Sequence, residues 1–233
     1  MIISGTIINV LAVVVGSLLG LLFHARLPQR FVGIIFQAIG LFTLALGMKM
    51  ALGANSWLIV VLSLIVGGLS GELLRLEARF DGMATNLSRK LKTKNARFNE
   101  GLLTAFLLYC MGSMTVLGAI EEGMGGKPEL YYLKSVMDGI SSIALASGMG
   151  IGVLFSVVPL FIYQGGLTLF AFWFGSFFPE QLITEISAVG GVLLLGLGLN
   201  ILKVTSMKML NLLPALVFAA FFAWLSWYFG WVV

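Results

Sequence analysis

Runs of about 20 consecutive apolar residues recur along this chain, and they constrain its fold more than any other feature. A helix of that length crosses the hydrocarbon core of a bilayer and satisfies all of its own backbone hydrogen bonds. Hydrophobic residues make up 59% of the 233 positions and charged residues 10%. The sequence therefore predicts an all-α, polytopic helical membrane protein.

The hydropathy pattern predicts about eight transmembrane helices. They leave no room for a separate soluble domain, so we expect a single membrane domain over residues 1–233. The fifth span is the shortest, since roughly 16 residues rise only about 24 Å against a core of about 30 Å. Seven spans with a re-entrant fifth segment are the alternative. The predicted spans are residues 3–23, 31–52, 57–74, 101–120, 133–148, 151–175, 182–202 and 209–231.

Basic residues indicate the orientation, because Lys and Arg collect in cytoplasmic loops. With eight spans, 11 of the 14 basic residues fall in odd-numbered loops, and Lys203 and Lys208 join them only if the fifth segment crosses. We therefore expect a multi-pass membrane protein with both termini outside, that is, periplasmic or extracellular. The basic residues of these loops are Arg26, Arg30, Arg75, Arg79, Arg89, Lys90, Lys92, Lys94, Arg97, Lys203 and Lys208.

The longest loop, residues 75–98, combines these basic residues with an apolar stripe at spacings of three and four. The pattern predicts an amphipathic helix on the cytoplasmic membrane face, with anionic lipid as its partner. An ordinary basic loop with some helix is the alternative. No module of aromatic and basic residues indicates nucleic-acid binding. The stripe consists of Leu76, Phe80, Met83, Leu87 and Leu91.

Glycines at four-residue spacing lie inside several spans. Such faces let helix backbones approach closely where lipid removes the hydrophobic drive for association. They predict a tight bundle, and they also suit the seam of a homo-oligomer. The pairs are Gly16 and Gly20, Gly67 and Gly71, and Gly148 and Gly152.

The second and seventh spans resemble each other at an offset of 151 residues, which predicts an inverted repeat because the two spans run in opposite directions. Inverted repeats are typical of transporters, with substrate bound where helices break. Coincidence in a chain rich in Leu and Gly is the alternative. Gly40, Leu44, Leu46 and Gly47 align with Gly191, Leu195, Leu197 and Gly198, and Lys49 aligns with Asn200.

The sixth span contains Pro159 followed by Gln164, Gly165 and Gly166. Proline and paired glycines free backbone groups that lipid cannot satisfy. We therefore expect either a broken sixth helix that lines a cavity or a plain proline kink.

Polar residues within the spans are the candidates for function, because a charge in mid-bilayer costs about 2.5–3.5 kcal/mol and normally faces protein or water. Lys134 and Asp138 stand four residues apart on one helical face, and Ser141 and Ser142 follow one turn later. This stripe suits a small polar solute or a proton relay, although Lys134 paired with Asp138 also explains a stable short span. The predicted pathway residues are Asn9, Lys134, Asp138, Ser141, Ser142, Gln164 and Asn200, and secondary candidates nearer the span ends are Lys49, Glu72 and Glu185.

Motifs of catalysis and metal binding are missing from the sequence. It contains no HExxH, GxSxG or CxxC, and it has a single histidine, His24, and a single cysteine, Cys110. We therefore expect no enzyme activity, no cofactor, no metal site and no disulfide.

Six stretches together carry a family resemblance: GTIINVLAVVVGSLLG (residues 5–20), CMGSMTVLGAIEEG (110–123), KSVMDGISSI (134–143), YQGGLTL (163–169), EISAVGGVLLLGLGLNIL (185–202) and NLLPAL (211–216). In this order they resemble the bacterial membrane-protein family catalogued as domain of unknown function 554. The resemblance implies a polytopic protein of the bacterial inner membrane, and some members are described as transporters without an established activity. It also places Lys134, Ser135, Asp138, Gly139, Ser141 and Ser142 in the family pattern.

Two functions from different classes fit these observations. The first is a membrane transporter or channel for a small polar solute or ion, with Asp138 binding a cation or proton. The second is a non-transporting structural or regulatory membrane protein that forms oligomers through its glycine faces.

Overall fold

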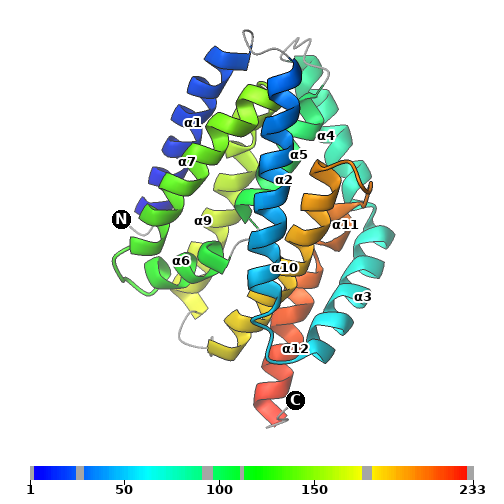
Figure 1. Ribbon diagram of the computed structural model, residues 1–233. Coiled ribbons are helices and arrows are strands. Elements are labelled where there is room, and N and C mark those ends of the chain that lie inside the picture. Colours follow the sequence, from blue (N-terminus) through cyan, green and yellow to red (C-terminus); the bar gives the residue numbers. More distant parts are fainter. Residues whose placement is uncertain (1–2, 25–28, 91–96, 111–112, 175–179, 230–233) are drawn as a thin grey trace. The chain divides into compact units, whose positions relative to one another are not determined.

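The computed structural model describes residues 3–24, 29–90, 97–110, 113–174 and 180–229, and the regular elements in these ranges are all helices (Figure 1). This confirms an all-α polytopic membrane protein. The helices are α1 (Ser4–His24), α2 (Gln29–Ala51), α3 (Trp57–Leu74), α4 (Leu76–Lys90), α5 (Phe98–Cys110), α6 (Ser113–Gly123), α7 (Glu129–Met149), α8 (Gly152–Phe155), α9 (Val157–Phe174), α10 (Glu180–Ile201), α11 (Met209–Leu212) and α12 (Ala215–Phe229).

The chain divides into two compact units, each built from separate stretches of sequence. Unit 1 comprises residues 1–39, 83–110 and 114–177, and unit 2 comprises residues 40–82, 111–113 and 178–233. Unit 1 therefore holds α1, α5, α7, α8, α9 and most of α6, while unit 2 holds α3, α10, α11 and α12. The helices α2 and α4 each contribute one half to either unit.

Five helical segments among the described residues are long and apolar enough to cross a membrane. A sixth is added if α5 and α6, which meet at a bend of 60°, count as one broken span. The helix α7 matches the length of a span with its 21 residues, but Lys134, Asp138 and its serines lower its hydropathy. The predicted fourth span is thus bent, and the doubtful fifth is a continuous helix.

In unit 1, α1 and α7 pack side by side and run parallel (Figure 1). A Cβ built on Gly16 would lie 2.2 Å from the Gly139 carbonyl oxygen, and one on Gly20 would lie 2.4 Å from the Ile143 carbonyl oxygen. Contacts therefore advance in the same direction along both helices. The parallel arrangement is the one that the eight-span topology requires of its first and fifth spans.

The glycines at the end of α7 and in α8 also meet neighbouring helices within unit 1. A Cβ on Gly148 would lie 2.8 Å from the Phe36 ring, and a Cβ on Gly152 would lie 2.1 Å from the Phe98 carbonyl oxygen. Gly148 therefore allows α2 to lie close to α7, and Gly152 allows α5 to lie close to α8.

The predicted break in the sixth span lies elsewhere. The helix α9 continues from Val157 through Pro159, Gln164, Gly165 and Gly166, and the interruption falls at Ser156, between α8 and α9. Pro159 is the third residue of α9, where its missing N–H has no partner within the helix in any case. The helix α9 is therefore continuous through Pro159 and the paired glycines, and the only interruption of this span among the described residues lies before it.

In unit 2, α2 and α10 cross antiparallel through the glycines of the 151-residue offset. A Cβ on Gly47 would lie 2.7 Å from the Gly191 carbonyl oxygen, and a Cβ on Gly198 would lie 3.1 Å from the Gly40 carbonyl oxygen. The offset aligns Gly40 with Gly191 and Gly47 with Gly198. Exchanging the two segments therefore converts one contact into the other.

The helix α3 packs antiparallel on α11 and α12 through its own glycine pair. A Cβ on Gly67 would lie 2.3 Å from the Ala215 backbone, and one on Gly71 would lie 1.9 Å from the Asn211 carbonyl oxygen. The glycine face of α3 is therefore covered by α11 and α12 of the same chain.

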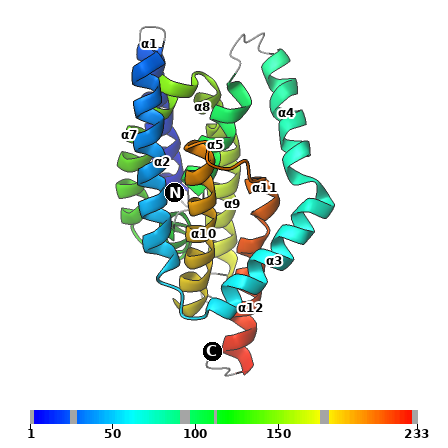
Figure 2. The same cartoon turned by 45° about the vertical axis from the view of Figure 1, so that its right-hand side comes forward.

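The helices α3 and α4 meet at Arg75, which adopts a left-handed conformation (φ 50°, ψ 47°) and bends the chain (Figure 2). Beyond the bend, Asn211 Oδ1 accepts the Glu77 N–H (2.8 Å), and Glu77 Oε2 accepts the Leu210 N–H (3.1 Å). Each side chain thus caps the start of the helix that holds the other.

Within the predicted interfacial segment 75–98, α4 is helical over Leu76–Lys90. Leu76 and Phe80 are half-buried, while Met83 is 71% exposed. The Leu87 side chain and residues 91–96, including Leu91, lie outside the described residues. Binding of anionic lipid by this segment stays a prediction.

Candidate functional site

A buried ion pair lies in the middle of α7. The Lys134 ammonium donates to Asp138 Oδ2, as the four-residue spacing predicts, and the two residues are only 4% and 8% exposed. The ammonium also lies 5.9 Å from the centre of the Tyr109 ring of α5. Both charges of this pair are therefore buried inside the protein and almost completely shielded from whatever surrounds it.

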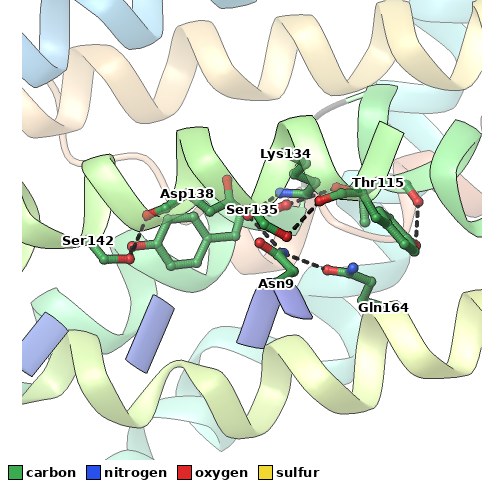
Figure 3. Close-up of polar contacts among 9 residues, drawn as sticks. Asn9, Thr115, Lys134, Ser135, Asp138, Ser142 and Gln164 are labelled. Carbon is green, nitrogen blue, oxygen red and sulfur yellow. Dashed lines mark hydrogen bonds and ion pairs between the residues drawn. The ribbon is translucent and has the colours of Figure 1, made fainter. Parts of the chain in front are cut away.

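Two amide side chains from other helices complete what we call the Asp138 cluster, formed by Asn9, Lys134, Asp138 and Gln164 (Figure 3). The Asn9 Nδ2 of α1 donates to Asp138 Oδ2 (3.0 Å) and to Gln164 Oε1 of α9 (2.9 Å). Both amides are fully buried. Four of the predicted pathway residues, from three helices, thus meet at one point.

The charge of Asp138 fixes the orientation of both amides. Turning the Asn9 amide over would aim its oxygen at the carboxylate, and Asn9 Nδ2 in turn requires the oxygen of Gln164. The atoms that remain are Asn9 Oδ1, an acceptor, and Gln164 Nε2, a donor. Neither has a hydrogen-bond partner within the described part of the chain.

The two serines of the predicted stripe have different roles. The Ser142 hydroxyl donates to the Asp138 carbonyl oxygen (2.6 Å) and shares a hydrogen bond of 2.7 Å with the Tyr109 hydroxyl. It therefore ties α5 to the turn of α7 that holds Asp138. Ser141 is half-buried at the neighbouring position of the helix.

Sequence reasoning missed Tyr131, which is fully buried one turn before Lys134. Its hydroxyl donates to the Thr115 carbonyl oxygen of α6 (2.9 Å) and lies 3.5 Å from Thr168 Oγ1 of α9. Tyr131, Ser135, Asp138 and Ser142 follow the i, i+4, i+7, i+11 spacing of one helical face, and this signal was available in the sequence.

Glu122 was also missed, because the sequence places it in a loop. It lies near the end of α6 and is 3% exposed. Its Oε1 accepts from Ser4 Oγ (2.9 Å) and from the Gly5 N–H (2.6 Å), so it caps the start of α1. Its Oε2 is buried without a partner among the described residues.

The remaining predicted residues belong to unit 2, where their hydrogen bonds are local. Asn200 accepts from the Met207 N–H (2.9 Å) and donates to its carbonyl (2.7 Å), which closes the loop after α10. Glu185 accepts from the N–H groups of Asn55 (3.0 Å) and Ser56 (2.9 Å) at the start of α3. Both residues stabilise helix ends in this unit.

Glu72 and Lys49 lie at the surface of unit 2. Glu72 forms an exposed ion pair with Lys208 (2.8 Å) and accepts from Asn211 Nδ2 (2.6 Å), while Lys49 is exposed on α2. Among the described residues, no group of three or more His, Cys, Asp or Glu side chains is arranged to hold a metal ion.

The helices and the Asp138 cluster define a polytopic helical membrane protein with an ion pair buried inside one of its units. The chain belongs to the family described as Protein of unknown function (DUF554), whose model matches residues 4–224. The resemblance inferred from the sequence is thereby confirmed.

Two curated relatives are similar to the chain over nearly their whole length. One is named "Uncharacterized membrane protein YdfK" from Bacillus subtilis (strain 168), with 36% identity over 217 residues, 91% of this chain and 92% of the relative. The other is named "Uncharacterized protein YqgA" from Escherichia coli (strain K12), with 32% identity over 231 residues, 96% of this chain and 98% of the relative. No solved structure matches the chain.

Proposed function

We propose that this protein provides a transmembrane pathway for a small polar solute or ion, and that Asp138 is its binding point. The observation that carries the proposal is the convergence of a buried carboxylate, a buried ammonium and two buried amides from α1, α7 and α9. Polar clusters of this kind inside membrane bundles mark substrate and ion routes.

The energetics favour a functional role for the cluster over a structural one. Each charge costs about 2.5–3.5 kcal/mol to insert, whereas a hydrogen bond between helices contributes only about 0.6 kcal/mol on average. The helix α7 is already held against α1 by the close contacts of Gly16 and Gly20. Packing alone therefore does not require Lys134 or Asp138.

In this mechanism Lys134 acts as an internal counter-ion. A cation or proton that reaches Asp138 competes with the Lys134 ammonium for Oδ2, while Asn9 holds the carboxylate in place. Gln164 positions the Asn9 amide, and Ser142 positions the turn of α7 that holds Asp138. In the pathway, the transported cation or proton thus replaces the Lys134 ammonium as the partner of the Asp138 carboxylate.

The reciprocal glycine contacts of α2 and α10 support a transport function independently. They are what an inverted repeat produces about a twofold axis, and such repeats recur in secondary transporters. The proposal includes this repeat within unit 2, an inner-membrane location with both termini outside, and anionic lipid as the partner of residues 75–98.

The alternative is a structural or regulatory protein that oligomerises through its glycine faces. Gly16 and Gly20 contact α7, and Gly67 and Gly71 contact α11 and α12. Because these faces are filled within the chain, an oligomer needs a different surface. This observation favours the transport proposal.

The test is flux across liposomes that contain the purified protein. Gradients of H⁺, Na⁺, K⁺ and Cl⁻ are followed with ion-sensitive dyes, and gradients of urea and glycerol by light scattering. We expect flux of at least one probe with the wild type and none with Asp138→Asn. Glu185→Gln is the matched control, since it alters a buried carboxylate of unit 2 and should leave flux intact. Equal flux for wild type and Asp138→Asn would contradict the proposal.

A further inference from the structure

Four buried side chains near the start of α1 each hold a polar atom without a partner in the described structure. These atoms are Thr6 Oγ1, Asn9 Oδ1, Gln164 Nε2 and Glu122 Oε2. The residues are 0–3% exposed. Unpaired buried polar atoms are rare in native proteins, and each costs about 1–3 kcal/mol unless water or a ligand satisfies it.

Contacts between helices link the four residues that hold these atoms, which we call the Glu122 row: Glu122, Thr6, Gln164 and Asn9. Glu122 Oε1 accepts the Gly5 N–H, next to Thr6 in α1, and Thr6 Cγ2 lies 3.9 Å from a Cβ built on Gly165, next to Gln164 in α9. The residue after Glu122, Gly123, approaches the Thr168 carbonyl oxygen, with 2.7 Å to a Cβ built there, and Thr168 lies one turn from Gln164. Gln164 then bonds Asn9, and Asn9 bonds Asp138.

The chemistry of the unpaired atoms identifies what fits beside them. Gln164 Nε2 can only donate, while Asn9 Oδ1 can only accept and a Glu122 carboxylate oxygen does the same. A metal cation does not suit the amide N–H, and an anion does not suit the two acceptors. Water donates and accepts, and buried water typically makes about three hydrogen bonds to such groups.

We propose that water molecules occupy the Glu122 row and carry protons between Glu122 and Asp138. The proposal rests on the proposed function and deepens it, because it identifies the ion that reaches Asp138 as a proton. A proton leaves a protonated Glu122 carboxyl group as its O–H bond breaks, passes along the hydrogen-bonded waters by successive transfer, and forms an O–H bond on the Asp138 carboxylate. Glu122 is left as a carboxylate that can take up the next proton. The Lys134 ammonium keeps its three protons and loses its charged partner.

Other titratable groups face the two ends of this path. Tyr131 of α7 lies near Glu122. Near Asp138, the Lys134 ammonium lies 5.9 Å from the centre of the Tyr109 ring, and the buried Cys110 thiol lies close to the pair. Glu122 is the carboxylate of the row, at the same end of unit 1 as the start of α1.

The first experiment asks whether the row is wet. Thr6→Cys and Gln164→Cys add one thiol each, and Cys110 is buried and supplies the baseline. Matched controls are Ile8→Cys and Ile162→Cys on the same helices, whose positions are 40% and 68% exposed on apolar faces. The probe is silver ion applied to intact liposomes, followed by titration of the remaining thiol after unfolding. We expect loss of the thiol in the row at a rate at least tenfold above that of the controls. Equal rates would overturn the proposal.

The second experiment asks whether Glu122 passes protons. Glu122→Gln keeps an oxygen that accepts from Ser4 and Gly5, so the cap of α1 is retained while the titrating group is lost. Liposomes that contain a pH-sensitive dye, with the membrane potential clamped by valinomycin, report proton flux after a pH step. We expect Glu122→Gln to slow the Asp138-dependent flux at least tenfold and Glu122→Asp to restore a substantial part. Equal flux in Glu122→Gln and wild type would overturn the role of Glu122.

The two proposals fail in different ways. Reactive thiols in the row with no flux of any probe would contradict the transport function and the proton transfer, and leave only the presence of water in the row standing. Unreactive thiols together with Asp138-dependent flux of another ion would contradict the water path and leave the transport function standing.

Discussion

The Asn9 side chain joins two helices through one nitrogen, which lies 3.0 Å from Asp138 Oδ2 and 2.9 Å from Gln164 Oε1. It therefore supports both the charge on α7 and the amide on α9. Removing Asn9 leaves two buried acceptors with one partner fewer, and such losses cost about 1–3 kcal/mol.

We expect Asn9→Ala to lower the thermal unfolding temperature in detergent. Replacing Gln164 by Leu in the same chain should recover part of the loss, because it removes the amide that Asn9→Ala leaves without its partner. Calorimetry or a dye-based unfolding assay of the single and double variants gives the coupling between the two residues. Additive effects would show that the amides are not in contact.

Charge balance in the Lys134–Asp138 pair gives a second prediction. Removing one partner leaves an uncompensated buried charge, with a cost of about 3–5 kcal/mol, whereas replacing both partners by neutral residues of similar size is often nearly neutral. Lys134→Met alone should therefore destabilise the protein much more than Lys134→Met combined with Asp138→Asn. Unfolding in denaturant should show this order, and the reverse order would rule out the pair.

The approach of α1 to α7 predicts a large effect at Gly16. A Cβ there would meet a backbone oxygen at 2.2 Å, so Gly16→Ala should force the helices apart and lower the unfolding temperature. Gly166→Ala is the control in the same unit, because nothing lies within 4 Å of its Cβ position. The control should be neutral or stabilise α9 by about 0.5–1 kcal/mol through helix propensity. Similar effects at both positions would contradict the packing.

The Glu77 carboxyl predicts a dependence of stability on pH. Burial raises the pKa of Glu77 above its ordinary value of 4.5, because desolvation disfavours the charged form. A raised carboxyl pKa gives a contribution to stability that is complete below the unfolded-state pKa and is lost as pH rises through the folded-state pKa. Glu77→Gln keeps an acceptor for the Leu210 N–H and should remove this slope. Unfolding temperatures measured from pH 4 upward would show it, and identical slopes in wild type and variant would contradict it.

The sequence was sufficient to predict the helical membrane class and the polar face of α7. Apolar runs specify helices in lipid by themselves, and a spacing of four residues places Lys134 and Asp138 together without knowledge of any partner helix. The pairing of α1 with α7 and α9 depends on which faces meet, and hydropathy does not contain that information. Asn9 and Gln164 were therefore nominated as polar exceptions in apolar runs, without a prediction that they touch.

The same reasoning fails where a polar residue stands near a helix end. Asn200 gave the same signal as Asn9, but it is the second-last residue of α10 and its amide closes the following loop. Glu122 gave the opposite error, since a carboxylate near a turn resembles a solvated loop residue until α1 is seen to begin against it. Tertiary contacts decide both cases.

The parallel seam between α1 and α7 has a consequence for biogenesis. More than 100 residues separate the end of α1 from the start of α7. At about 5–20 residues per second, the ribosome needs on the order of 10 s to supply them. During that time α1 has left the ribosomal exit tunnel, but α7 is not yet present to cover Asn9 and the glycines of α1. A nascent chain arrested before Glu129 should therefore present α1 as a substrate for insertion chaperones and membrane proteases, and release of α7 should end that exposure.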